Sequence, residues 1–69
     1  MILYVCKDNY EKEQMKSILN KDVMCIFAGQ ALAGRSFDKI IFRYSSHDEK
    51  YIEFLKTKLK INGDFINID

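Results

Sequence analysis

Two uninterrupted apolar runs constrain the fold of this chain more than any other feature of its sequence. One extends from Ile2 to Cys6 and the other from Val23 to Ala28, and neither alternates with polar residues. Continuous runs of this length are typical of strands covered on both faces, as in a parallel sheet beneath helices. Parallel strands also need a crossover, and the 16 residues between the two runs are enough for one that contains a helix.

The segment between the two runs has the pattern of a short amphipathic helix. Asp8 or Asn9 can cap its N-terminus, and apolar side chains then recur at helical spacing from Tyr10 to Leu19. A strand, a helix and a strand joined by short links make a βαβ unit, which is expected to be right-handed.

The middle of the chain predicts a loop and a third strand. Small residues and two glycines favour a loop from Gly29 to Ser36, and β-prone residues resume from Phe37 to Tyr44.

The last third of the chain predicts a second helix and a short final strand. Ser46 and Glu49 have the spacing of a capping box, which places this helix at about His47–Lys60. Asn62-Gly63 is expected to form a left-handed stop. The alternating polarity of Phe65–Ile68 is typical of a strand near a sheet edge.

Together these elements predict a single small α/β domain over residues 1–69, with the order βαββαβ. We expect a four-stranded, mostly parallel sheet with two helices, on one face or on opposite faces. The first two strands are expected to be neighbours, with the third on the other side of the first. The predicted core consists of Leu3, Val5, Met15, Ile18, Leu19, Val23, Cys25, Ile26, Ile40, Ile41, Phe42, Tyr51, Ile52, Leu55, Leu59 and Ile66.

Composition excludes several classes of protein. The chain is 48% apolar with a net charge of +1, which argues against a disordered chain, a histone-like polycation and an acidic mimic of DNA. It contains no apolar run long enough to span a membrane, and its N-terminal residues lack the features of a secretory signal. Cys6 and Cys25 lie within the apolar runs, so we expect buried, reduced thiols and a cytoplasmic location, in the host if the protein is phage-encoded.

The residues that carry enzyme chemistry are sparse in this sequence. His47 is the only histidine, so any Ser or Cys nucleophile would depend on it as a base. Gly29 and Gly34 are spaced like two glycines of a Walker loop, but the Lys-Ser/Thr pair that would follow is missing. We therefore expect no enzymatic activity, no cofactor and no metal site.

The segment from Leu32 to Phe42 reads Leu-Ala-Gly, three residues, Asp, one residue and Ile-Ile. It resembles the "Leu-Arg-Gly, three residues, Asp, one residue, Ile-Ile" stretch of phage terminase large subunits and related helicase-like P-loop ATPases. In that family the stretch leads into the strand that carries the Walker B acidic pair. Residues 4–14 are similar to the strand and Gln-containing helix that precede it there. The resemblance implies a phage-encoded chain that corresponds to an ATPase core without its first strand and phosphate loop.

This chain departs from that family where the chemistry resides. Arg43-Tyr44 stands in place of the Asp-Glu pair that serves magnesium and water activation, and Ala33 stands in place of the Arg before Gly. Magnesium and a triphosphate therefore have no recognisable ligands, and ATP hydrolysis is not expected.

Two functions remain open from the sequence. The leading one is a non-enzymatic interaction protein, a phage accessory or early factor that binds a host or phage protein. The alternative is a nucleic-acid-binding accessory module that uses the region Gly29–Tyr44, where basic and aromatic residues interleave. Monomeric and homo-oligomeric states are both open. The candidate binding residues are Gly29, Gln30, Gly34, Arg35, Ser36 and Arg43, because loops at strand ends commonly bind ligands.

We predict that the chain binds no nucleotide, because the Lys-Ser/Thr pair is missing and Arg43-Tyr44 replaces the acidic pair. Isothermal titration calorimetry with magnesium and ATP should show no heat of binding. A micromolar dissociation constant would overturn this prediction.

Overall fold

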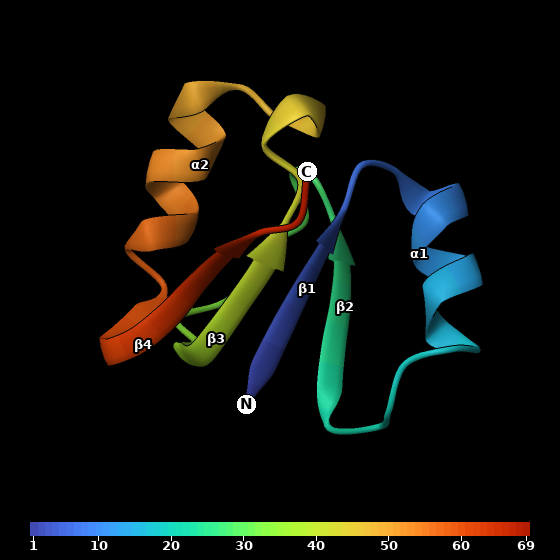
Figure 1. The fold of residues 1–69 in the computed structure, drawn as a ribbon, viewed down its shortest axis with the longest axis horizontal. Helices are drawn as coiled ribbons and strands as arrows, with labels where there is room; N and C mark the ends of the chain where they lie inside the picture. Colours follow the sequence, from blue (N-terminus) through green and yellow to red (C-terminus); the bar gives the residue numbers. More distant parts are fainter.

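Four parallel strands in one sheet and two helices make up the structure, a computed structural model that describes residues 1–69 (Figure 1). The order βαββαβ confirms the predicted α/β fold. A 3₁₀ turn at Tyr44–Ser46 precedes the second helix. The elements are β1 (Ile2–Cys6), α1 (Asn9–Lys16), β2 (Val23–Phe27), β3 (Phe37–Phe42), α2 (Glu49–Lys56) and β4 (Leu59–Asn67).

The strand order is β2-β1-β3-β4, and all three neighbouring pairs are parallel. β1 and β2 are neighbours and β3 lies on the other side of β1, as predicted. The chain thus moves outward from β1 to β2 and then returns past β1 to build β3 and β4. This reversal creates a topological switch point between β1 and β3, where open α/β sheets commonly bind ligands.

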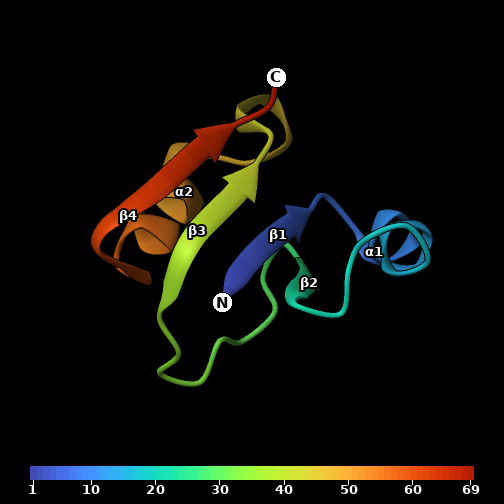
Figure 2. The ribbon, with the colours of Figure 1, turned by 60° about the horizontal axis from the view of Figure 1, so that its bottom comes forward.

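The two helices lie on opposite faces of the sheet. Leu3 and Val5 of β1 pack in one cluster with Ile52 and Leu55 of α2. On the other face, Lys12 of α1 lies over the Phe27 ring at the end of β2, at 5.3 Å from its centroid. In Figure 2, α2 lies behind β3 and β4, whereas α1 lies beside β2 at the other end of the sheet in Figures 1 and 2.

The loop at residues 28–36 takes the place of a helix in the crossover from β2 to β3. It contributes Leu32, of which only 2% is exposed, to the cluster on the α2 side. A tight turn follows, in which the Arg35 amide donates to the Leu32 carbonyl at 3.0 Å. Ala33 and Gly34 occupy its centre with φ of 45° and 73°, which is the pattern of a type I′ turn.

Both helices are shorter than predicted. The predicted start of the second helix is wrong because the Asp48 carboxylate, not Ser46, caps it by accepting from the Tyr51 amide at 2.8 Å. Its predicted end is also wrong, since α2 ends at Lys56. The first helix ends at Lys16 rather than Leu19, and Asp8 is its cap.

The final strand starts much earlier than predicted, at Leu59. The Phe37 amide donates to the Lys58 carbonyl at 2.8 Å, so the chain pairs with β3 directly after α2. An irregularity in the β3–β4 register then accommodates Asn62-Gly63, which lies within β4 rather than ending a helix. A side chain at Gly63 would meet the Asp38 carbonyl oxygen at 2.7 Å, so only glycine fits there without a shift.

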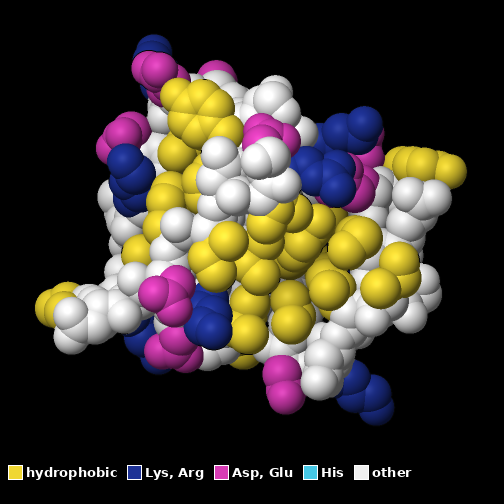
Figure 3. All heavy atoms as spheres, viewed as in Figure 1, with side chains coloured by type: hydrophobic (Ala, Val, Ile, Leu, Met, Phe, Trp, Pro, Cys, Tyr) yellow, Lys and Arg dark blue, Asp and Glu magenta, His cyan; other side chains and the backbone are white.

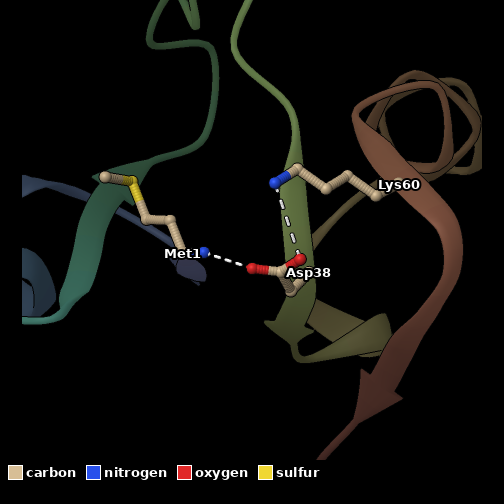
Figure 4. A network of polar contacts seen from close by, with 3 residues as sticks. All are labelled: Met1, Asp38 and Lys60. Atoms are coloured by element: carbon tan, nitrogen blue, oxygen red, sulfur yellow. Dashed lines mark hydrogen bonds and ion pairs between the residues drawn. The ribbon is translucent and has the colours of Figure 1, made fainter.

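The Asp38 side chain ties this irregular segment to its neighbours (Figure 4). Its carboxylate accepts from the amino group of Met1 and forms an ion pair with Lys60 at 3.6 Å. The amino group is the larger cause of a lowered pKa at Asp38. All three groups are substantially exposed, so we assign this network little stability.

The core is smaller than the sequence predicted. Ile18 was expected inside but is 73% exposed, because α1 ends before reaching it. Many of the other expected core residues are only half-buried, Ile41 and Ile66 among them. The buried residues absent from the predicted core are Tyr4, Cys6, Leu32 and Phe37.

No helix in the structure is long and apolar enough to cross a membrane.

The type I′ turn provides a test of this backbone. Ala33→Gly should raise the free energy of unfolding by about 1 kcal/mol, because an L side chain at this φ costs about that much. The matched control is Ala31→Gly, which changes an exposed alanine whose φ is not positive and should be neutral or destabilising. Urea denaturation of both variants measures the difference. A loss of stability in Ala33→Gly would contradict the turn.

Candidate functional site

The carboxyl ends of β1 and β3 form the switch point, and an ion pair bridges it. Arg43, directly after β3, contacts Glu11 in the first turn of α1, with Nη1 and Oε2 at 3.7 Å. The Glu11 side chain is only 13% exposed. Burial and, next, the Glu11 charge raise the pKa of the Cys6 thiol to about 11. The fully buried Cys6 is therefore a neutral thiol at physiological pH, rather than a nucleophilic thiolate.

The N-termini of both helices are occupied by side chains of the protein itself. The Asp8 carboxylate accepts from the Glu11 amide at 2.9 Å, and the Asp48 carboxylate accepts from the Tyr51 amide at 2.8 Å. Phosphate groups bind at such positions because the free amides and the helix dipole favour an anion. Here a carboxylate already fills each position, which disfavours a bound phosphate.

A hollow of about 340 Å³ lies beside the switch point, over the end of β2. His47 and Tyr51 line it, with their ring centroids 5.3 Å apart. Both ring nitrogens of His47 and the hydroxyl of Tyr51 are buried and lack hydrogen-bond partners. Burial lowers the pKa of His47, and the nearby charge of Glu11 offsets this in part. Burial therefore favours the neutral form of the imidazole.

The structure divides the predicted binding residues between two ends of the sheet. Gly29, Gln30 and Arg43 lie at the carboxyl ends of β2 and β3, whereas Gly34, Arg35 and Ser36 precede the amino end of β3. The loop runs the length of the sheet between them, with Leu32 in the core. Arg35 and Arg43 are therefore separated by the whole of β3 and do not form one patch. Binding of a partner by the predicted residues at either end of the sheet stays a prediction.

Several of these residues have contacts within the chain. The side-chain Oε1 of Gln30 accepts from the Phe27 amide and from Lys12 Nζ, each at 3.3 Å, and so joins α1 to the end of β2. Arg35 Nη1 lies 3.9 Å from the Met24 sulfur at the opposite end of the sheet. Gly29 lines the His47 hollow, and Gly34 forms the turn described above.

A different surface stands out in space-filling view (Figure 3). Apolar side chains form a continuous area in the middle of the face that is turned toward the viewer in Figure 1. On this face α1 packs against β1 and β2, and no helix lies over β3 and β4. We call it the open face. The apolar residues of this face are Ile2 and Tyr4 of β1, Ile41 of β3 and Ile66 of β4.

Sequence reasoning missed the open face because it assigned Ile41 and Ile66 to the core. The parallel register aligns Tyr4 with Ile41 and Ile41 with Ile66, which places the three side chains in one row. The two isoleucines are half-buried, because α1, the only helix on this face, packs against β1 and β2, at the Tyr4 end of the row. The number of predicted helices could have indicated an uncovered face, because two helices are too few to cover both faces of four strands.

Comparison of the chain with protein-family models, curated proteins and solved structures found no match to any of them. The resemblance of residues 32–42 to phage terminase large subunits stays a prediction.

The buried imidazole of His47 predicts a pH dependence of stability. Its pKa in the folded protein lies below the ordinary value of 6.5, so the unfolded chain binds the proton more readily. The melting temperature should therefore fall as the pH is lowered from about 7.5 to about 5.5, over the window set by the ordinary histidine pKa.

The matched control is His47→Gln, which cannot titrate in this range and should flatten the pH profile between the same two values. Thermal denaturation followed by circular dichroism measures both proteins. A melting temperature of the unmodified protein that stays constant or rises on acidification would contradict the neutral, buried state of His47.

Proposed function

We propose that this chain is a small, non-enzymatic interaction protein that binds a protein partner through its open face. The observation that carries the proposal is the row of Tyr4, Ile41 and Ile66, in which the half-buried Ile41 and Ile66 have no helix over them. Contiguous apolar surface of this kind marks interaction sites more often than single exposed apolar residues do.

The surroundings of the row fit a protein interface. Lys39 and Asp64 lie on the same face, two residues before Ile41 and Ile66 in their strands, and both side chains are exposed. Arg43 follows Ile41 by two residues and so lies beyond the row, directly after the end of β3. An apolar centre within a charged rim is the common composition of protein–protein interfaces.

The state of the reactive groups supports the non-enzymatic part of the proposal. The Cys6 thiol is inaccessible and its pKa is raised to about 11, so it does not provide a nucleophile. The nitrogens of His47 are buried without partners, and neither Cys6 nor a serine hydroxyl donates to them. Nucleophilic catalysis needs a base within hydrogen-bond reach of the nucleophile.

The biological setting that we propose rests on the sequence resemblance. A phage-encoded accessory factor that binds a host or phage protein agrees with the terminase-like segment at residues 32–42. The carboxylates of Asp8 and Asp48 at the helix N-termini agree with the loss of phosphate binding in such a derivative.

The nucleic-acid alternative gains little from the geometry. Arg35 and Arg43 lie at opposite ends of β3, and Glu11 balances the charge of Arg43. Binding to a phosphate backbone depends on several uncompensated cations along one surface. We therefore place this function second.

A matched pair of isoleucines in β4 tests the proposed function. Ile66→Glu should abolish capture of the partner, because it introduces a charge into the centre of the open face. Ile61→Glu should leave capture unchanged, since Ile61 is 92% exposed and lies in the irregular segment away from the row. The measurement is affinity capture of each tagged variant from native cells, with quantitative mass spectrometry of the recovered proteins.

Melting temperatures of both variants provide the folding control, because Ile66 is half-buried. Should Ile66→Glu fail to fold, Ile66→Thr retains the β-branched shape and should reduce capture in the same direction. Full recovery of partners with folded Ile66 variants, or their loss only with Ile61→Glu, would place the interface elsewhere.

A further inference from the structure

Two opposite charges lie side by side on the open face without forming an ion pair. Lys39 of β3 and Asp64 of β4 are register partners, so their backbones are about 4.8 Å apart in neighbouring strands. Both side chains are exposed. Neither takes part in any ion pair or side-chain hydrogen bond of the structure, although Arg43 and Asp38 nearby are both paired.

These two charges and the two isoleucines above them form a self-complementary pattern. Ile41 and Ile66 are register partners on the same strands, two residues further along. A twofold axis that runs parallel to the strands, between β3 and β4, exchanges the two strands of each copy. It places Lys39 against Asp64 of a second copy, and Ile41 against Ile66 of that copy. Such an isologous contact repeats every interaction twice.

We propose that the occupant of the open face is a second copy of this chain, in a symmetric dimer built on Lys39–Asp64 and Ile41–Ile66 contacts. The inference rests on the proposed function, because it assigns a partner to the same surface. The net charge of +1 leaves two copies without appreciable mutual repulsion. The sheets then pack face to face with their strands nearly aligned, which is a common arrangement of stacked sheets.

The other face-to-face symmetry is disfavoured. A twofold axis that runs across the strands makes the strands of the two copies antiparallel. The amino ends of β3 and β4 in one copy then lie against their carboxyl ends in the other. Lys39 and Asp64 would then each lose the oppositely charged partner in the second copy. This arrangement therefore lacks the charge complementarity of the first.

The size of the face predicts a weak dimer. The open face across β1, β3 and β4 measures about 14 Å by 17 Å, from the ordinary strand spacing and rise. This footprint of about 240 Å² is well below the roughly 800 Å² that each partner buries in a standard stable interface. We therefore expect a reversible dimer that dissociates on dilution.

Charge reversal tests the proposal directly by sedimentation equilibrium over a wide range of protein concentrations. The unmodified chain should shift from 8.1 kDa toward twice that mass as concentration rises. Lys39→Glu should remain a monomer, because it sets Glu against Asp64, and Asp64→Lys should remain a monomer for the converse reason. Lys50→Glu is the matched control, since Lys50 is exposed on α2 and forms no ion pair, and it should dimerise like the unmodified chain.

Mixing the two monomeric variants separates a direct contact from a folding defect. Lys39→Glu combined with Asp64→Lys has attractive pairs at both contacts, so the equimolar mixture should form a heterodimer. The double variant should likewise regain the homodimer. Recovery in both experiments supports the proposed symmetry, whereas monomers in either one overturn it.

The failure of this inference is distinguishable from the failure of the proposed function. If the unmodified chain stays at 8.1 kDa at every concentration, the second copy is not the partner and the inference is wrong. In that case loss of capture by Ile66→Glu, with Ile61→Glu unchanged, still supports the open face as the binding surface for a different protein.

Discussion

A parallel sheet has two faces, and the apolar side chains of both have to be removed from water. In this chain α2 and the loop that carries Leu32 cover one face, whereas α1 covers only the half of the other face that belongs to β1 and β2. Tyr4 and Cys6 lie under or beside α1 and are buried, and Ile41 and Ile66 lie farther away and stay half exposed. The proposed binding surface follows from this shortage of helical cover.

The first two strands were the most predictable part of the fold. The bounds of β1 are those of the continuous apolar run from Ile2 to Cys6. Apolar side chains point to both faces of such a run, so they are removed from water only when both faces are covered. The length of α2 was less predictable. Lys56 ends it, although apolar spacing continues to Leu59, because pairing of the next residues with Phe37 in β3 replaces the helical bonds. Such a competition depends on a partner strand that is distant in the sequence.

The candidate site was less predictable than the fold, since it depends on where a loop leads. Arg35 and Arg43 are close in the sequence and flank one strand, so a pattern-based prediction joined them. The crossover loop and β3 instead place them at opposite ends of the sheet. Ile41 was assigned to the core because an apolar residue in a strand gives no indication of which face a helix will cover. Only the register and the position of α1 show that this face is open.

Isoleucine methyl resonances report most directly on the central claim, that the open face is where this chain associates. The chain has isoleucines on both faces of the sheet and in the exposed segment of β4. In methyl-labelled NMR spectra recorded at increasing protein concentration, the account predicts shifts for Ile41 and Ile66, with the buried Ile52 of α2 and the protruding Ile61 unchanged. Shifts confined to Ile52 or Ile61, or none at any concentration, would contradict the claim that copies of this chain meet at the open face.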